Sequence, residues 1–221
     1  MEQGNEKDSQ RIEKVLGILE ETYPDATTEL MHQNPFQLLI ATMLSAQTTD
    51  RQVNKVTPGL FERFPEAKAL GEADVREIEE LIKTCGFYKT KARNIKEACR
   101  IITERYNGRV PDTMEELTSL PGVGRKTANV VLSNAFGVDA IAVDTHVFRV
   151  ANRLRLAASE NVKGTEEQLM ENIPRDKWSK SHHWLIHHGR RVCKARKPLC
   201  NECPLSEVCE WRVRLKWIEN R

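Results

Sequence analysis

Apolar side chains recur along residues 92–106 with the period of a helix. They are separated by intervals of 3, 4, 3 and 4 residues, so they form one stripe that a helix would bury. Asn107 and Gly108 follow directly, and both tolerate the left-handed backbone conformation that ends many helices. Cys99 belongs to the stripe and is interpreted as a core residue. The apolar positions are Ala92, Ile95, Cys99, Ile102 and Tyr106.

Capping residues mark the ends of further helices. Asn34 precedes Pro35, which is typical of an N-cap followed by the first helical position. Asp74 precedes another amphipathic run, and Thr113 and Glu116 have the spacing of a capping box. These signals predict where helices begin, independently of the apolar stripes.

The apolar pattern provides almost no strands. Residues 140–143 are the only segment that could form one, and four residues make no sheet. The histidines between residues 182 and 188 flank Trp, Leu and Ile, which indicates a packed helix and no metal site. The sequence therefore predicts an all-α protein of about ten helices with short connections.

Composition excludes several classes of protein. Of the 221 residues, 39% are hydrophobic and 30% are charged, which suits a folded domain with a solvated surface. The longest apolar stretches, such as residues 38–41, are far shorter than the roughly 18 residues that a membrane helix needs. Residues 1–14 lack the apolar segment of a signal peptide. We therefore expect a cytoplasmic protein with reduced cysteines and no membrane partner.

The net charge of +2 conceals an uneven distribution. Residues 1–30 carry three Lys or Arg and eight Asp or Glu, which gives 3 − 8 = −5. Residues 188–221 carry nine Lys or Arg and four Glu, which gives 9 − 4 = +5. The basic end could contact a polyanion. An ordinary solvated surface is the plainer interpretation, and charge alone favours it.

A glycine-containing turn is the first candidate functional element. Residues 120–131 read Leu-Pro-Gly-Val-Gly-Arg-Lys-Thr-Ala-Asn-Val-Val, and Gly122 and Gly124 predict a tight turn between two helices. Amide groups at the start of the second helix, where Arg125 and Thr127 lie, can bind a phosphate. This indicates a helix–hairpin–helix that binds a nucleic-acid backbone without reading base sequence. A bare Gly-x-Gly would indicate only an αα-hairpin, but the whole string is more specific.

Lys126 begins the second helix of this hairpin, where a cation is electrostatically unfavourable. The positive end of the helix dipole favours the neutral amine, which is the nucleophilic form. A neutral amine can attack a sugar or carbonyl carbon and form a Schiff base. A lysine that only contacts phosphate fits the local sequence equally well, so both interpretations stay open.

Asp144 is the candidate acid. It lies just before a helical pattern, so an ordinary N-cap is a strong alternative and one residue can serve both purposes. A carboxylate held by helix amides stays ionised. It could then deprotonate an amine or stabilise a developing cationic sugar.

Four of the six cysteines lie close together near the C-terminus. Their spacing is Cys193-x6-Cys200-x2-Cys203-x5-Cys209, which is typical of a tetrathiolate site for Zn²⁺ or for an iron–sulfur cluster. Zinc ribbons usually contain two Cys-x2-Cys pairs, whereas this segment has one, so the spacing disfavours a ribbon. No pattern assigns chemistry to Cys85.

The segment between the first two of these cysteines is strongly basic. It contains Lys194, Arg196 and Lys197, and Arg190 and Arg191 precede it without an acidic residue in between. A metal-clamped basic loop would present cations to phosphate rigidly.

Together, residues 120–131, residues 143–150 and the four cysteines resemble the endonuclease III family. These are DNA repair glycosylases of the helix–hairpin–helix superfamily with a glycine/proline-rich loop and a downstream aspartate. The resemblance extends over roughly residues 24–211 and includes residues 44–50 and 91–95.

The resemblance implies two α-helical domains. A six-helix barrel would span residues 28–138 and contain the hairpin, and residues 1–27 and 139–221 would form a discontinuous iron–sulfur domain. The four cysteines would hold a [4Fe–4S] cluster that supports the basic loop and takes no part in turnover. DNA would lie in a groove between the domains, with Lys126 and Asp144 facing each other.

The resemblance also implies a reaction on double-stranded DNA with damaged bases or abasic sites. A damaged base must leave the stack, and Gln47 would fill the space while Phe87 contacts the opposite strand. The family often has an aliphatic residue at the position of Phe87, and a buried core aromatic is the alternative there. Lys126 would attack C1′, expel an oxidised pyrimidine and permit β-elimination 3′ to the lesion.

Three alternatives stay open. The first is a base-only mismatch glycosylase of the same superfamily, although such an enzyme needs no amine at Lys126. The second is a non-enzymatic DNA-binding module stapled by Zn²⁺, and the third makes the cluster an electron-transfer centre. We expect a monomer associated with the nucleoid.

Overall fold

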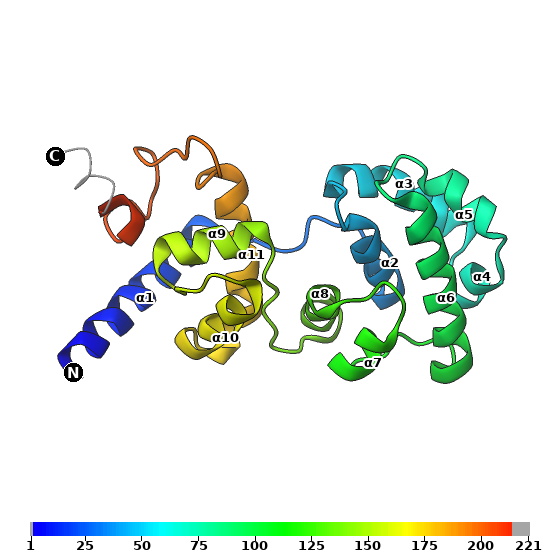
Figure 1. The fold of residues 1–221 in the computed structure, drawn as a ribbon, viewed down its shortest axis with the longest axis horizontal. Coiled ribbons are helices and arrows are strands. Elements are labelled where there is room, and N and C mark those ends of the chain that lie inside the picture. The colour runs from blue at the N-terminus through cyan, green and yellow to red at the C-terminus, as the bar shows by residue number, and fades with distance from the viewer. Residues whose placement is uncertain (1, 214–221) are drawn as a thin grey trace. The chain divides into compact units, whose positions relative to one another are not determined.

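The computed structural model describes residues 2–213, and within them the chain forms helices and connecting segments with no strand (Figure 1). The all-α prediction is confirmed. These residues contain eleven α-helices and one short 3-10 helix, close to the ten expected. The last eight residues of the predicted iron–sulfur domain, 214–221, lie outside the described residues. They include three of the nine Lys or Arg residues counted in the basic end.

The chain divides into two compact units. We call Thr28–Val138 the central unit, and Met1–Thr27 with Asp139–Arg221 the terminal unit. The central unit has seven helices, one more than the resemblance implies. They are α2 (Pro35–Ser45), α3 (Asp50–Arg63), α4 (Ala67–Glu72), α5 (Val75–Ile82), α6 (Tyr88–Tyr106), α7 (Met114–Ser119) and α8 (Arg125–Phe136).

The described part of the terminal unit contains the remaining elements. They are α1 (Glu2–Thr22), α9 (Thr145–Leu154), α10 (Val162–Asn172), the 3-10 helix Arg175–Lys177 and α11 (Trp178–Arg191).

Helix α2 lies in the core of the central unit. It begins at Pro35 because the Asn34 side chain accepts a hydrogen bond from the Gln37 amide at 2.9 Å. Most of its length is buried, including all of residues 38–41, because the helix packs against α3, α6 and α8 (Figure 1). A helix that is apolar on every side is stable only when other elements surround it.

Helix α6 confirms the stripe predicted from the sequence. Ala92, Ile95, Cys99 and Ile102 are all fully buried in the central core. The helix ends where predicted, at Asn107 with φ +52° and Gly108 with φ +77°. Burial raises the pKa of the Cys99 thiol to about 12, which agrees with its interpretation as a core residue.

The other predicted caps are also present. The Asp74 side chain accepts a hydrogen bond from the Arg76 amide at 2.9 Å, and Thr113 Oγ1 accepts one from the Glu116 amide at 3.3 Å. These contacts fix the starts of α5 and α7. Residues 140–143, the only candidate for a strand, instead connect α8 to α9 with their side chains buried.

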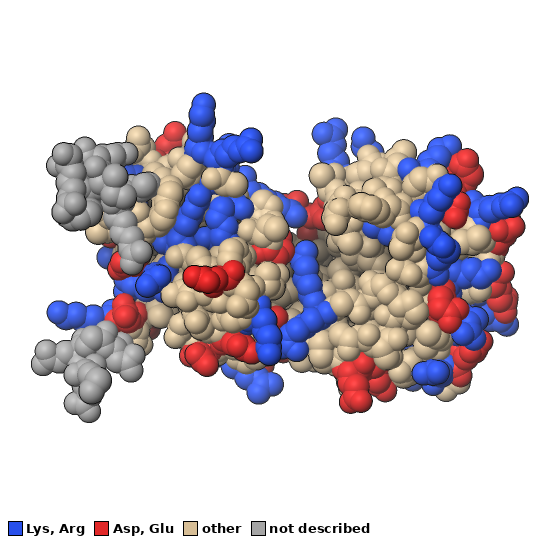
Figure 2. Space-filling model, viewed as in Figure 1, with Lys and Arg blue, Asp and Glu red and all other residues tan. Residues whose placement is uncertain are grey.

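The terminal unit has a second core, in which Trp184 of α11 is one of the largest buried side chains. The acidic and basic ends of the sequence share this unit. Glu20 of α1 forms ion pairs with Lys177 at 3.2 Å and Lys180 at 3.6 Å. Figure 2 shows basic and acidic side chains mixed over the visible face of both units. On this face, charge alone therefore does not mark a binding surface.

No helix within residues 2–213 combines the length and the apolar character that crossing a bilayer requires.

Candidate functional site

The predicted hairpin is formed by α7, a five-residue turn and α8. Gly122 has φ +78° in this turn, a conformation that side chains rarely adopt. A Cβ at this position would also lie 2.9 Å from the side chain of Asn94 on α6. Gly122 is therefore required for its backbone conformation and for its close approach to Asn94.

Helix α8 presents its N-terminus to solvent. Gly124 is the N-cap residue and has no side chain to accept hydrogen bonds from the first-turn amides, and the first turn has no acidic residue. Arg125 and Lys126 are exposed there, and Thr127 is half-buried. An N-terminus with a positive dipole end and two exposed cations suits an anionic ligand.

Asp144 is the N-cap of α9, so the capping interpretation is correct. One carboxylate oxygen, Oδ1, accepts hydrogen bonds from the amides of His146 and Val147, both at 2.8 Å. Among the described residues, none donates a hydrogen bond to Oδ2. Capping therefore uses one oxygen of the carboxylate, and the other is available for chemistry. Lys126 belongs to the central unit and Asp144 to the terminal unit, so their facing each other stays a prediction.

Gln47 and Phe87 lie on two connections of the central unit, and both are exposed. The side chain of Phe87 is 67% exposed, so the alternative of a buried core aromatic is wrong. Both residues have positive φ, +54° for Gln47 and +58° for Phe87. Two non-glycine residues in this strained conformation need support from their surroundings.

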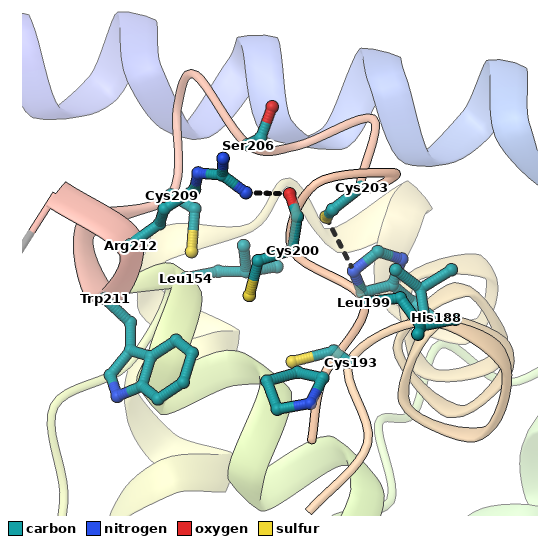
Figure 3. Close-up of a pocket in the computed structure, with 12 residues that line it drawn as sticks. Leu154, His188, Cys193, Leu199, Cys200, Cys203, Ser206, Cys209, Trp211 and Arg212 are labelled. Carbon is teal, nitrogen blue, oxygen red and sulfur yellow. Dashed lines mark hydrogen bonds between the residues drawn. The ribbon is translucent and has the colours of Figure 1, made fainter. Parts of the chain in front are cut away.

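The four cysteines of the C-terminal segment line one pocket of the terminal unit. Figure 3 shows their sulfur atoms turned toward the space that they share. None of these thiols forms a disulfide. The apolar side chains that close the pocket are Leu154, Val192, Pro198, Leu199 and Trp211.

The chemistry of this pocket fits an iron–sulfur cluster. Four thiols in apolar surroundings are the usual ligand set of such clusters. Burial raises the pKa of Cys203 to about 11 and also raises the pKa of Cys209. A cationic metal centre would bind such cysteines as thiolates, and their protons would be released to solvent. Among the described residues, no three His, Cys, Asp or Glu side chains are close enough to hold a single metal ion.

His188 supports this pocket, a role that the sequence analysis missed. Its Nε2 lies 3.6 Å from Cys203 Sγ (Figure 3). Its Nδ1 lies 3.0 Å from the hydroxyl of Tyr23. Burial lowers the pKa of His188 to about 4, so the ring is neutral. A proton on Nε2 lets Tyr23 donate to the ring and the ring donate to the sulfur. Nothing in the sequence indicates this contact, because Tyr23 and His188 are 165 residues apart.

Arg153 of α9 holds the backbone of the basic loop, defined here as residues 194–197. Its guanidinium donates to the carbonyls of Lys194 at 2.8 Å and Ala195 at 3.1 Å, and to Cys193 Sγ at 3.4 Å. Its guanidinium also lies over the Trp211 ring, with Cζ 4.3 Å from the ring centroid. The loop is therefore fixed from inside, while its side chains Lys194, Arg196 and Lys197 are exposed.

Two families match this chain. The HhH-GPD superfamily base excision DNA repair protein family matches residues 40–175, and the iron-sulfur binding domain of endonuclease III matches residues 193–209. Endonuclease III of Synechocystis sp. is 54% identical over 201 residues, which cover 90% of this chain and 92% of that protein. Endonuclease III of Escherichia coli K12 is 48% identical over 207 residues, which cover 94% of this chain and 98% of that protein.

Solved structures match more than nine-tenths of the chain. A trapped endonuclease III–DNA covalent intermediate superposes with a TM-score of 0.89 and 47% identity, covering 94% of this chain and 98% of that chain. A thermostable thymine-DNA glycosylase superposes with a TM-score of 0.83 and 26% identity, covering 93% of this chain and 98% of that chain. The iron–sulfur match spans all four cysteines of the pocket, so the expected cluster is supported and the zinc alternative is disfavoured.

We expect Cys203→Ser to lose the cluster, because a serine hydroxyl is a poor ligand for iron beside three thiolates. The measurement is iron and sulfide content together with visible absorbance of the purified protein. Cys85→Ala is the matched control, since Cys85 is a buried thiol of the central unit, away from the pocket. The control should keep full iron content. An unchanged iron content in Cys203→Ser would exclude this thiol as a ligand.

Proposed function

Because this chain belongs to the endonuclease III family, we propose that Lys126 and Asp144 carry out its reaction on double-stranded DNA that contains oxidised pyrimidines or abasic sites. The protein is a base excision repair glycosylase and abasic-site lyase with an iron–sulfur cluster. The choice of lesion and the roles of individual residues are the parts that we propose.

The position of Lys126 carries this proposal. Lys126 is exposed in the first turn of α8, directly after the hairpin turn that would bind a DNA phosphate. An endonuclease III with 47% identity to this chain has been trapped as a covalent intermediate with DNA. An exposed amine beside a phosphate-binding turn is well placed to form such a bond to deoxyribose.

The reaction proceeds in two stages at Lys126. The neutral amine attacks C1′, the bond from C1′ to the base breaks, and the base leaves with its bonding electrons. The C1′–O4′ bond then breaks, the ring oxygen takes up the proton that the amine loses, and a Schiff base results. The Schiff base acidifies the C2′–H bond, and loss of that proton expels the 3′ phosphate by β-elimination. No oxidant or reductant is needed.

Asp144 acts through the carboxylate oxygen that does not cap α9. Oδ1 accepts hydrogen bonds from two amides, which fix the orientation of the carboxylate. Oδ2 can then accept a proton from the attacking amine or stabilise positive charge on the sugar. One residue therefore serves as both N-cap and catalytic group.

Gln47 and Phe87 assist extrusion of the lesion. Flipping a nucleotide costs a few kcal/mol, because stacking and pairing are lost. Exposed side chains that enter the duplex offset part of this cost. We assign Gln47 to the vacated space and Phe87 to the opposite strand.

The basic loop supplies phosphate contacts from the terminal unit. Lys194, Arg196 and Lys197 point to solvent from a backbone that Arg153 and the cysteines fix. The cluster, held by the four cysteines, keeps this segment folded. The protein would act as a monomer and associate with the nucleoid because its substrate is chromosomal DNA.

We expect borohydride to trap a covalent adduct between the protein and duplexes that contain thymine glycol or an abasic site. Lys126→Gln should form no adduct, because an amide cannot form a Schiff base. Mapping the adduct by mass spectrometry provides the measurement. Lys68→Gln is the control, since Lys68 is an exposed lysine of α4 in the same unit, and it should trap normally.

The same experiment separates the alternatives. Base release without trapping in Lys126→Gln would favour the base-only glycosylase. A parent protein that binds DNA but neither releases base nor forms an adduct would favour the non-enzymatic module.

We expect Asp144→Asn to slow base release by about 10² to 10⁴-fold, the usual contribution of a general acid–base group. Asparagine caps helices as well as aspartate does, so thermal stability and DNA affinity should change little. Asp144→Ala should also lose about 1 kcal/mol of stability with the cap. Single-turnover rates and melting temperatures distinguish the two roles. Near-normal rates in Asp144→Asn would leave only the capping role.

We expect combined replacement of Lys194, Arg196 and Lys197 by Ala to weaken binding to every DNA sequence. The slope of log affinity against log salt should fall by about 0.9 for each phosphate that these side chains no longer neutralise. Fluorescence anisotropy at several salt concentrations provides the measurement. Lys163→Ala, at an exposed lysine of α10 that pairs with Glu167, is the control and should not change the slope. An unchanged slope in the loop variant would remove the loop from the interface.

A further inference from the structure

Two short connections of the central unit carry the side chains that we assign to the duplex. The first linker, residues 46–49, joins α2 to α3 and contains Gln47. The second linker, residues 83–87, joins α5 to α6 and ends with Phe87. Each of these two residues has positive φ, which costs on the order of 1–3 kcal/mol unless neighbouring contacts hold it.

The two linkers lie against each other and are joined by a hydrogen bond from a backbone amide to a side chain. The Gly86 amide donates a hydrogen bond to Thr48 Oγ1 at 3.1 Å. A Cβ at Gly86 would lie 3.1 Å from the carbonyl oxygen of Gln47, so a side chain here would crowd the first linker. Gln52 at the start of α3 adds a hydrogen bond from Nε2 to Thr84 Oγ1 at 2.6 Å.

Lys91 of α6 joins both linkers at once. Its ammonium donates hydrogen bonds to the Leu44 carbonyl at 2.7 Å and to Thr48 Oγ1 at 2.8 Å. Its backbone amide donates to the Phe87 carbonyl at 3.0 Å. One residue therefore contacts the first linker through its side chain and the second linker through its backbone.

Lys91 is a buried cation whose loss of hydration these hydrogen bonds must compensate. Lys91 is only 8% exposed, and burial lowers the pKa of its ammonium. A buried cation is costly unless hydrogen bonds compensate it. The Leu44 carbonyl belongs to the last turn of α2, where carbonyls lack helical partners and carry partial negative charge. The ammonium charge is therefore compensated by the C-terminal end of α2 and by the hydrogen bond to the Thr48 hydroxyl.

We infer that Lys91 is a positioning residue for base extrusion, which holds Gln47 and Phe87 at a fixed mutual spacing before DNA binds. This inference rests on the proposed roles of Gln47 and Phe87 in the duplex. Linkers whose backbone conformation is already fixed lose less entropy when Gln47 and Phe87 enter DNA than free loops would lose.

A positioning role predicts that the loss of rate differs between substrates. A residue that only stabilises the fold would slow all substrates equally. A lesion opposite adenine is paired and stacked, so its extrusion needs the inserted side chains. A lesion opposite an abasic spacer has lost its partner, and its extrusion costs less. Loss of Lys91 should therefore slow the first substrate much more than the second.

The test compares Lys91→Met with Lys96→Met. Both lysines lie on α6 and donate to a carbonyl outside it, since Lys96 Nζ donates to Ala73 at 2.6 Å, but Lys96 does not contact either linker. Single-turnover base release is measured on thymine glycol opposite adenine and opposite an abasic spacer. Lys91→Met should be slower than the parent by at least about tenfold opposite adenine and within about twofold opposite the spacer. Lys96→Met should match the parent on both.

Thr48 provides a second pair of variants in case Lys91→Met does not fold. Thr48→Val removes the hydroxyl that accepts from Lys91 and Gly86, while Thr48→Ser keeps it. Thr48→Val should show the same selective loss opposite adenine, and Thr48→Ser should restore the parent rates.

Equal losses on both substrates, or no loss on either, would overturn the positioning role. A parent protein that releases no base and forms no adduct would instead contradict the proposed function. The two failures are therefore distinguishable.

Discussion

The ends of helices leave backbone amides and carbonyls without partners, and an all-helical chain must satisfy them at every end. This protein places its proposed chemistry at such ends. Asp144 caps α9 with one carboxylate oxygen, and the uncapped start of α8 is available to a phosphate beside Lys126. The Lys91 ammonium satisfies a carbonyl in the last turn of α2. The same electrostatics that stabilise the helices therefore orient the groups that would act on DNA.

The cysteine pocket extends this principle to a segment without helices of its own. Residues 194–208 form turns, so their conformation depends on contacts from elsewhere in the terminal unit. Arg153 and Arg149 of α9 bind carbonyls at Cys193, Lys194 and Ala195, and His188 of α11 contacts Cys203. The cluster completes a framework that packed helices already surround. Such a framework explains how a loop of exposed cations keeps one shape without a core of its own.

Features determined by neighbouring residues could be predicted from the sequence. The stripe on α6, the Asn34, Asp74 and Asp144 caps and the turn at Gly122 all depend on residues within one or two helical turns. The family resemblance supplied the cluster and the enzyme class. Contacts between distant segments could not be predicted, because helix register and packing decide them. Tyr23 with His188, Arg153 with the basic loop and Lys91 with the first linker are of this kind. The exposure of Phe87 also required the structure, since an aromatic residue beside Gly86 fits a core equally well.

The proposed reaction takes its amine from the central unit and its carboxylate from the terminal unit. Each group is positioned inside its own unit: the hairpin turn places Lys126 at the start of α8, and two amide hydrogen bonds orient Asp144. The strained linkers are likewise held within the central unit, by Lys91 and Thr48. Local contacts can therefore fix each group accurately before substrate arrives, which is the condition for low reorganisation during catalysis. In the proposed reaction DNA supplies the sugar on which both groups would act, and extrusion of the lesion would expose it.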